Sequence, residues 1–500
     1  MSSFDIQAEI EPIGMLPEKA YGVPLTGFEV AAAAGIGVDV IEITPDLPTY
    51  NTTHPVGDDD YTVDEDYFKF LRIQIVRQVG GVTSKHIIID MPNPDEIKIE
   101  PPLATAITIG DDINLIPSTI QGRIVRAPNE LEMGRTAEGG VGDGLYKEHP
   151  IEAARMGKIT FDTQAGSDFF KYGDNVYAYS SLKAFVMTYD GKIPNDMSGD
   201  LNIRERPNSS TIKSFSLCYR MRQSPNQIRL LTGCIATQTS ISFDDDMSSH
   251  LSENHEVLYG YMLRTLPDKT IPPDLPYKRY LLRSHGHCTS VFTHGTVLGL
   301  PAGPTDTLLT VGSVTGYEDG DDIIITSKID GYQFPTTITT VDVTAKTFLV
   351  SPALPAARNW TEGDVIEQDP STSAKRVKIR KLDITLNNQG EIFGHIGSGK
   401  TGPTQGVANG SDYNGSITLD RESNQVSFDM QYDQNDLLWW KHKLQLAYNS
   451  NILADFTLEY EAFNTSNLTE ELKVEMERMV DAFGFQIKNI TEAKIAKSLP

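Results

Sequence analysis

The stretch Gly394–Thr401 reads GHIGSGKT and matches every fixed position of the phosphate-binding loop pattern G-x-x-x-x-G-K-[ST]. In such a loop, backbone N–H groups and the lysine hold nucleotide phosphates at the start of a helix. The residues that follow, GPTQGVANGSDYNG, contain Pro403 and four glycines, which disfavour a helix starting at Lys400. We therefore expect a flexible glycine-rich loop between strands, with no cofactor and no enzymatic activity.

A second group of residues that could do chemistry lies in RSHGHCTSVFTH, which brings His285, His287, Cys288 and His294 close in sequence. Imidazole and thiolate groups are zinc ligands, and in a strand His285 and His287 would share a face. Their spacing is not that of a closed structural zinc site. We therefore expect them to be ordinary sheet residues and predict no metal site.

The chain is strongly acidic, with 68 Asp and Glu against 43 Lys and Arg among its 500 residues, for a net charge of −25. Proteins that grip DNA neutralise its phosphates with basic side chains, so this charge disfavours a DNA-binding protein. It suits a surface past which DNA slides without sticking. The alternative, that the acidity only keeps an abundant protein soluble, stays open here.

Membrane and export signals are not apparent in the sequence. No run approaches the roughly 18 consecutive apolar residues of a membrane span, and the first residues, MSSFDIQAEIEPIG, do not read as a signal peptide. Three cysteines are too few for a disulfide framework and suit a reducing compartment. We expect a soluble protein made in a cytoplasm, with no membrane partner.

Alternation of apolar and polar residues dominates the chain and predicts a mainly β fold. LLTGCIATQTSISF, from Leu230, predicts a long strand with one polar face, and VKIRKLDITLNNQG predicts another strand. NGSITLDRESNQVSFDMQYD predicts a hairpin that is also polar on one face. The other face of the first strand is expected to hold Ile235, Thr237, Thr239, Ile241 and Phe243.

One or two helices are expected beside the strands. At the end of the chain, Asn467 is a capping residue, an apolar stripe runs from Leu468 to Phe483, and Gly484 ends the helix. A second helix is expected over part of Gly144–Met156.

Residues 300–370 read as a small β-domain inserted into a larger one. Short strands alternate there with turn residues every eight to twelve positions, and the segment holds eleven acidic and three basic residues. We divide the chain accordingly into a core part at 1–299, which leaves room for added elements in 1–160, the inserted acidic domain at 300–370, and a core part at 371–500.

Two segments resemble the tail tube proteins of tailed bacteriophages. SFSLCYRMRQSPNQIRLLTGCIATQTSISFDDD has a strand, a spacer, and Gly-Cys entering a long alternating strand. DITLNNQGEIFGHIGSGKTGPTQGVANGSDYNGSITLDRESNQVSFDMQYD has the family's order of a strand, a Gly-rich loop and a Gly-Ser hairpin. The resemblance covers roughly 169–463 apart from the insertion, and AYGVPLTG at Ala20–Gly27 is reminiscent of the family's N-terminal segment.

The resemblance implies an antiparallel tail-tube-type β-sandwich or barrel core with long hairpins. It also implies a structural virion protein, a homo-oligomer whose stacked rings of sixfold or pseudo-sixfold symmetry form the conduit for genome ejection. The implied partners are further copies of the chain and other tail proteins, namely a terminator, a baseplate or tip, and a sheath where the tail contracts. DNA would pass through the lumen without specific binding, and the virion tail would be assembled in the host cytoplasm.

Several alternatives stay open at this point. The chain is long for one tube domain, so it either holds two tube-like halves that form trimers or one core with added domains. A baseplate or tail-tip protein with a tube-like fold is a second possibility. A nucleotide-binding enzyme that uses GHIGSGKT is the least favoured reading.

The polar faces of the two predicted hairpin regions are expected to line the channel, because their apolar faces must be buried. None of these residues is basic, so DNA phosphates would find no cation there. The residues expected to line the channel are Gln238, Ser240, Ser242, Ser416, Thr418, Gln425, Ser427 and Asp429.

Overall fold

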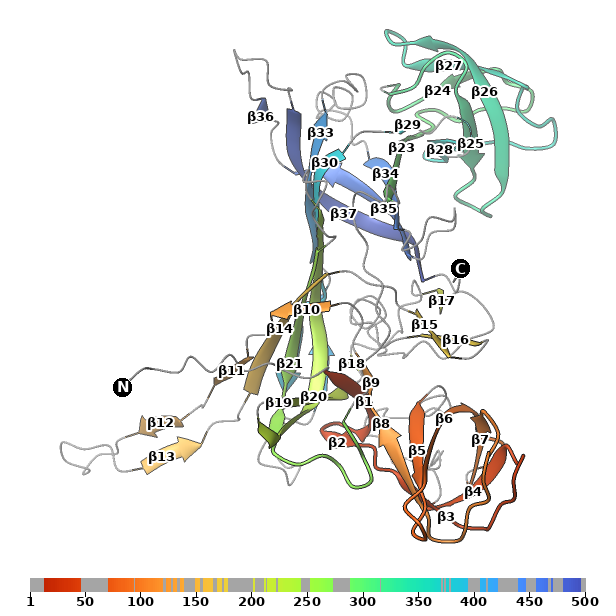
Figure 1. Cartoon of the computed structure of the whole chain (residues 1–500). Coiled ribbons are helices and arrows are strands. Elements are labelled where there is room, and N and C mark those ends of the chain that lie inside the picture. Colours follow the sequence, from red (N-terminus) through yellow and green to blue (C-terminus); the bar gives the residue numbers. More distant parts are fainter. Residues whose placement is uncertain are drawn as a thin grey trace.

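In the part of the chain that it describes, the computed structural model consists of strands and contains no helix (Figure 1). The predicted mainly β fold with antiparallel sheets is confirmed. Nothing in these ranges is a helix long and apolar enough to cross a membrane. The described residues are 13–45, 71–119 except 94, 123–126, 129–132, 135–138, 149–152, 156–164, 169–172, 175–178, 201–202, 211–221 except 213, 224–243, 252–272, 288–369 except 315, 372, 375–376, 379–393, 405–420 except 411, 439–446, 456–465, 469–470 and 480–495.

Both predicted helices are wrong where the structure describes their residues. At the end of the chain, Thr469–Glu470 (β36) and Val480–Ile495 (β37) are strands. In the earlier segment, His149–Glu152 (β13) and the start of Met156–Gln164 (β14) are strands as well.

The reason for the C-terminal failure is visible in the burial of β37. Phe483, Phe485 and Ile487 are buried in alternation, which is the period of a strand and not of a helix. β37 also pairs along both edges, with β33 and with β35. Pairing and burial on this scale override the weak local preference that the apolar stripe expresses.

Six strands near the start of the chain close a small barrel, which we call the first barrel (Figure 1). Its strand order is β3-β4-β7-β6-β5-β8, and the inward positions are mostly isoleucine, such as Ile73 and Ile75 of the RIQIV strand. Its strands are Phe28–Val30 (β3), Val40–Thr44 (β4), Arg72–Val76 (β5), Thr83–Asp90 (β6), Glu96–Glu100 (β7) and Asp112–Ile116 (β8).

A second barrel lies in the segment expected to form the inserted domain. The end of β23 pairs with β28, and the order continues through β25, β26 and β27 to β24. A bridge between Leu298 and Val311 returns to the start, and a separate core gathers around Trp360 and Phe348. The strands are Cys288–Val297 (β23), Leu308–Thr310 (β24), Asp322–Thr326 (β25), Gln333–Asp342 (β26), Thr347–Ser351 (β27) and Val365–Gln368 (β28).

The two barrels are copies of one module, because the same turn occurs at the same place in both. In TIGDDI, the Asp111 carboxylate accepts hydrogen bonds from the backbone N of Thr108, at 2.8 Å, and of Gln78, at 3.0 Å. In TEGDVI, Asp364 accepts them from Thr361, at 2.7 Å, and Lys328, at 3.0 Å. The glycine before each aspartate has a φ of 85° in the first barrel and 86° in the second.

The strands outside the barrels repeat in the same way. In the first half of the chain, neighbouring strands are β9, β1, β19, β20, β21, β14 and then β10 with β11. In the second half they are β29, β23, β34, β35, β37, β33 and β30. Corresponding strands follow one another in the same order along the chain, and each half carries its barrel after its first strand. The chain is therefore a tandem repeat of one architecture.

The strands of the two halves have the following bounds. In the first half they are Gly14–Ala20 (β1), Ser118–Thr119 (β9), Arg123–Arg126 (β10), Asn129–Glu132 (β11), Phe215–Met221 (β19), Ser224–Phe243 (β20) and Ser252–Tyr259 (β21). In the second half they are Lys375–Arg376 (β29), Ile379–Asn387 (β30), Asp412–Asp420 (β33), Trp439–Leu446 (β34) and Phe456–Asn464 (β35). The remaining short strands are Val23–Pro24 (β2), Arg135–Glu138 (β12), Phe169–Tyr172 (β15), Asn175–Ala178 (β16), Leu201–Asn202 (β17), Thr211–Ile212 (β18), Tyr261–Leu263 (β22), Gly390–Phe393 (β31) and Gln405–Ala408 (β32).

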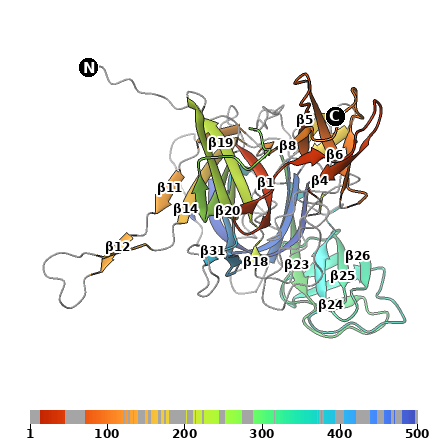
Figure 2. The same ribbon diagram turned by 90° about the horizontal axis from the view of Figure 1, so that it is seen from below.

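The two halves join edge to edge through β20 and β30, which pair from Gln238 opposite Asn387 to Phe243 opposite Leu382. This junction makes one continuous sheet of β10 with β11, β14, β21, β20, β30, β33 and β37, which we call the shared sheet. Its strands run through the middle of the molecule, with the two barrels toward opposite ends (Figure 1, and Figure 2 from below).

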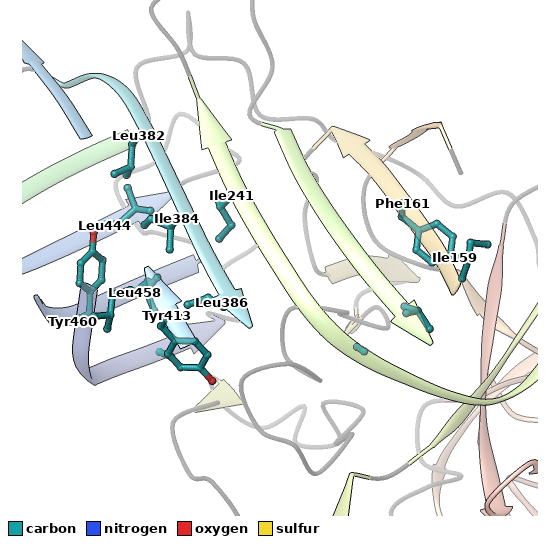
Figure 3. Packing of buried hydrophobic residues seen from close by; sticks show 14 of the residues in the cluster. Ile159, Phe161, Ile241, Leu382, Ile384, Leu386, Tyr413, Leu444, Leu458 and Tyr460 are labelled. Carbon is teal, nitrogen blue, oxygen red and sulfur yellow. The ribbon is translucent and has the colours of Figure 1, made fainter. Parts of the chain in front are cut away.

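The main hydrophobic core covers one face of the shared sheet (Figure 3). Leu382 and Ile384 of β30 and Ile417 of β33 are buried in this core together with Leu444 of β34 and Tyr460 of β35. The alternating apolar residues that predicted strands in VKIRKLDITLNNQG and NGSITLD are thus the ones that are buried. Because the core covers one face, the other face is left for polar side chains.

The long strand β20 contains a bulge that the sequence pattern did not predict. Ala236 lies opposite Val257, while Gln238 lies opposite Glu256, so Thr237 is an extra residue. An extra residue shifts the alternation of side chains by one. Residues an even number of positions apart normally share a face, but they point to opposite faces when the bulge lies between them.

The bulge corrects the predicted apolar face of β20. Ile241 lies in the main core, whereas Ile235, expected on the same face, packs with Tyr21 and Ile392 in a separate cluster. The strand therefore buries apolar residues on both faces near its middle. Only the part after the bulge has the expected polar face.

A buried carboxylate holds the bend of β20 just before the bulge. Glu18 accepts hydrogen bonds from the backbone N of Gly22 and of Gly233, each at 2.8 Å, from the hydroxyl of Ser216, at 2.6 Å, and from that of Ser214. Gly233 has a φ of 64°, which favours glycine. Burial raises the pKa of the Glu18 carboxyl, although these hydrogen bonds oppose the rise.

Stability is expected to fall as the pH rises through the range in which Glu18 ionises. Above its ordinary pKa of 4.5 the carboxyl of the unfolded chain loses its proton, while the buried one keeps it until its raised pKa is reached. The unfolded state then binds fewer protons, so the free energy of unfolding decreases with pH across this window. Glu18→Gln should lack this decrease in urea unfolding over a pH series. Parallel curves for the two proteins would contradict the assignment.

Candidate channel-facing surface

The candidate surface is the face of the shared sheet opposite the main core, which we call the polar face. Six strands contribute to it, and residues paired across the strands form rows. The central row is Asp162 on β14, Asn254 on β21, Ser240 on β20, Thr385 on β30, Asn414 on β33 and Gln486 on β37. Each member of this row is polar and none is fully buried, because the alternating neighbours carry the core.

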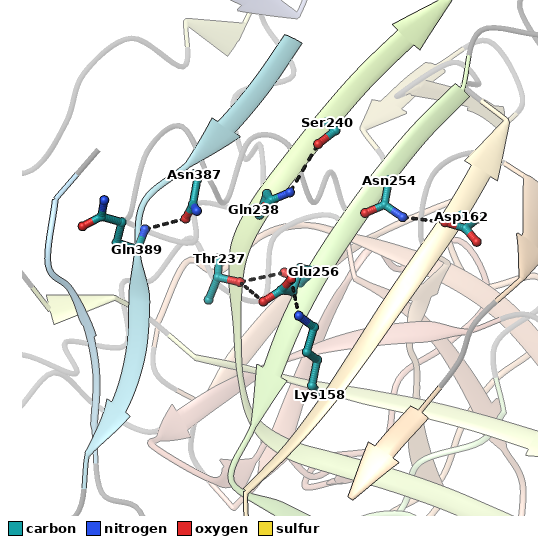
Figure 4. A network of polar contacts seen from close by, with 9 residues as sticks. All are labelled: Lys158, Asp162, Thr237, Gln238, Ser240, Asn254, Glu256, Asn387 and Gln389. Carbon is teal, nitrogen blue, oxygen red and sulfur yellow. Dashed lines mark hydrogen bonds and ion pairs between the residues drawn. The ribbon is translucent and has the colours of Figure 1, made fainter. Parts of the chain in front are cut away.

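Hydrogen bonds between side chains cross the strands of the polar face (Figure 4). Asn254 Nδ2 donates to Asp162 Oδ1 at 2.5 Å, and the hydroxyls of Ser240 and Thr385 lie 3.0 Å apart, across the junction of the two halves. Gln238 Nε2 donates to Ser240 Oγ at 3.4 Å. The polar groups of neighbouring strands thus satisfy one another.

The charges on the polar face correct one expectation from sequence. Lys158 and Lys381 lie there, so the face is not free of basic residues. Each lysine is paired with an acid: Lys158 Nζ lies 2.5 Å from Glu256 Oε2, and Lys381 Nζ lies 3.0 Å from Asp383 Oδ2. The edge strand β10 adds two arginines, because Arg126 is paired with Asp162 and Arg123 with Gln164.

Further acids give the polar face an excess of negative charge. Asp162 lies in the central row, and Asp412 is paired with Asn387 in the next row. A phosphate group approaching the central rows of this face would meet carboxylates, and it would meet Lys158 and Lys381, which already have anionic partners. Binding through phosphate neutralisation is therefore disfavoured.

Five of the residues predicted to line the channel lie on the polar face. Gln238, Ser240, Ser242 and Thr418 are partly exposed, and Ser416 is exposed. The structure brings them into one sheet, because Ser242 and Ser416 are each paired with Asp383 on β30.

The predicted hairpin does not appear in the form expected. Gln425, Ser427 and Asp429 lie outside the described residues. β33, the first strand of that hairpin, pairs with β30 along one edge and with β37 along the other. The neighbours of Ser416 and Thr418 on the sheet therefore come from distant segments.

Sequence reasoning missed the contributions of β14 and β21. Their residues Asp162, Asn254 and Glu256 complete the polar face on the side of the first half. The signal was present in GKITFDTQ and SENHEVLY, where apolar and polar residues alternate. It was overlooked because a helix was expected up to Met156, at the start of β14.

The motifs with the strongest catalytic appearance lie mostly outside the described residues. GHIGSGKT lies outside the described residues, between β31 and β32, which pair as an antiparallel hairpin. A strand thus begins at Gln405, close to the place where a phosphate loop needs a helix. His294 is buried in β23, and His285 and His287 are outside the described residues. Within the described ranges, no three His, Cys, Asp or Glu side chains are grouped to hold a metal ion.

No known family model matches the chain, and no curated protein matches it. Function is therefore inferred from the geometry of the polar face and from the repeated architecture.

The second half has a very different surface on β34, β35 and β37. Lys443 Nζ lies 2.7 Å from Glu492 Oε2 and 3.3 Å from Glu459 Oε2, and Lys441 Nζ lies 2.6 Å from Glu367 Oε1 on β28. The Lys443 pairs link β34 to β35 and β37, and the Lys441 pair links β34 to the second barrel.

Proposed function

We propose that this chain is a tail tube subunit of a tailed bacteriophage, a structural protein whose rings stack into the conduit for genome ejection. One observation carries the proposal: a continuous, polar, net acidic face spans six antiparallel strands contributed by both halves. A wall that carries DNA without holding it needs this chemistry, because an excess of carboxylates, together with lysines already paired with acids, disfavours contacts with phosphate.

The tandem repeat supports a particular ring. If each half takes the place of one tube domain, three copies supply six similar units, which gives pseudo-sixfold symmetry from a trimer. A trimer of chains that each hold two tube-like halves is thus favoured over a hexamer of chains that each hold a single core. Partners are then further copies of the chain and the other proteins of the tail, with DNA passing through the lumen in the virion.

Electron microscopy of the purified protein tests the proposal. Hollow rings or tubes with three copies per ring are expected, with the polar face toward the lumen. Many stacked rings per virion indicate a tube subunit, whereas a single ring per virion indicates a tip or baseplate component. A monomer that never forms a hollow assembly and is missing from virions would contradict the function.

The second barrel is expected to be dispensable for the tube. It has a core of its own, and the strands that flank it, β23 and β29, pair directly with each other. Replacing residues 300–370 with a short Gly-Ser linker should therefore preserve ring formation, since the cost of loop closure depends weakly on length. Micrographs should show tubes of smaller outer diameter. Loss of all assembly would show that the barrel is part of the ring contact.

A further inference from the structure

Inside the chain, the two halves join where β20 pairs with β30. Two other strands, β11 and β36, correspond to this pair but are not paired with each other in the described part of the chain. Gly157 on β14 lies opposite Tyr259, and Gly415 on β33 lies opposite Phe485, which fixes how the halves correspond. Leu131 on β11 is paired with Gly157, just as Ile384 on β30 is paired with Gly415. β11 therefore occupies in the first half the place that β30 occupies in the second.

By the same correspondence, β36 is the equivalent in the second half of the segment of β20 that pairs with β30. Thr469 is paired with Ala482, three residues before Phe485, and Gln238 is paired with Glu256, three residues before Tyr259. Thr469 thus stands in the place of Gln238. In the described part of the chain, β36 pairs only with β37, and β11 pairs only with β14.

We propose that β36 of one copy pairs with β11 of the next copy, antiparallel, in the way that β20 pairs with β30 inside the chain. The occupant of each edge is a second copy, because the chain itself contains the matching strand and shows how the two strand types pair. Exposed sheet edges tend to pair with a strand from another chain, and this pairing would cover them. The inference deepens the proposed function by naming the contact between ring subunits.

The register positions of β11 suit such a contact. Asn129–Glu132 reads N-E-L-E where the corresponding part of β30, Leu382–Thr385, reads L-D-I-T. Leu131 stands at the position of the core residue Ile384. Glu130 and Glu132 stand at positions that lie on the polar face in β30, so the contact between copies would carry the acidic face onward around the ring.

The contact is heterologous, since two different edges meet, and this property makes it testable with cysteines. We would combine Glu132→Cys and Thr469→Cys in a Cys288→Ser background, because the other cysteines, Cys218 and Cys234, are buried. Glu132 matches Thr385 and Thr469 matches Gln238, so the two would be diagonal neighbours on one face of the contact, about 7–8 Å apart and within reach of a short bis-maleimide. Denaturing gels should show ladders of dimers and trimers from the double variant.

Controls separate this contact from others. Each single variant alone should give no dimer, whereas a symmetric contact of β11 with β11 would crosslink Glu132→Cys by itself. A mixture of the two single variants should give dimers and nothing larger. Thr385→Cys with Thr469→Cys should give no crosslink between copies, because β30 already has neighbours on both edges. Gln238→Cys with Asn387→Cys should crosslink within one chain.

The outcomes distinguish the contact from the function. Tubes that form without the expected crosslink overturn the contact and leave the function standing. Crosslinked oligomers that are not hollow support the contact and count against the function. A chain that stays monomeric at high concentration overturns the contact, while detection of the chain along virion tails would still support the function.

Discussion

Tubes built from a chain with Ser240→Lys, Ser242→Lys and Ser416→Lys are expected to assemble normally and to obstruct DNA. All three positions are on the polar face, where substitutions usually change stability by about 0.5 kcal/mol or less each. In the native face Lys158 and Lys381 have acidic partners, whereas the three added lysines would outnumber the one acid opposite them, Asp383, and so leave cations open to phosphate. Each phosphate contact releases counterions and favours binding, most strongly at low ionic strength. DNA release from virions should slow sharply and recover as salt is added.

Glutamine at the same three positions is the matched control, because it adds length without charge. It should leave both assembly and DNA release close to those of the native protein. Equal slowing by glutamine and lysine would indicate simple narrowing of the channel. Unchanged DNA passage through tubes with all three lysines would mean that this face does not line the channel.

Gly157→Ala and Gly415→Ala are each expected to destabilise the fold by about 3 kcal/mol, at the upper end of overpacking costs. A Cβ at Gly157 would lie 2.0 Å from Tyr259 Cζ, and one at Gly415 would lie 2.4 Å from Phe485 Cζ. Both rings are buried on the core side, so neither has room to move away. The free energy of unfolding, measured with urea, should drop similarly for the two variants because they occupy equivalent places.

Two comparisons test the steric explanation. Gly35→Ala should be nearly neutral, because a Cβ there meets nothing within 4 Å. Combining Gly157→Ala with Tyr259→Ala should cost less than the sum of the two single changes, since the smaller residue removes the clash. Additive costs would show that the glycine matters for a reason other than the aromatic ring.

The β-structure was predictable where alternation is regular. LLTGCIATQTSISF and NGSITLD revealed their strands, since a sheet with one buried face requires period two. The bulge at Thr237 was not predictable, because the residues that cause it, including the strand partner Glu256, are close only in the fold. The end of the predicted C-terminal helix failed for a related reason: the stripe that runs to Phe483 has helical spacing, but from Val480 onward the pairing on both edges of β37 decides the conformation.

The length of the chain left two similar halves open as one alternative, but the sequence did not decide for them, because strands repeat a pattern more than particular residues. TIGDDI and TEGDVI are alike because the Asp111 and Asp364 turns need their side chains, and GKITFD and GSITLD are alike because a glycine must face an aromatic ring. Between these short matches, most apolar residues at inward positions fit the core equally well. Two short matches about 250 residues apart are weak signals in sequence, whereas the order of strand pairings makes them plain.

The link between the halves also changes the kinetics of building a ring. The β20–β30 junction joins two segments of one chain, so it forms at a rate that does not depend on protein concentration. A contact between copies is bimolecular and weakens on dilution. The tether gives the internal junction a high effective concentration, of the order of millimolar for short flexible linkers. Half of the seams in a three-copy ring would thus be complete before any subunits meet. Assembly would need two bimolecular encounters, where six separate domains would need five.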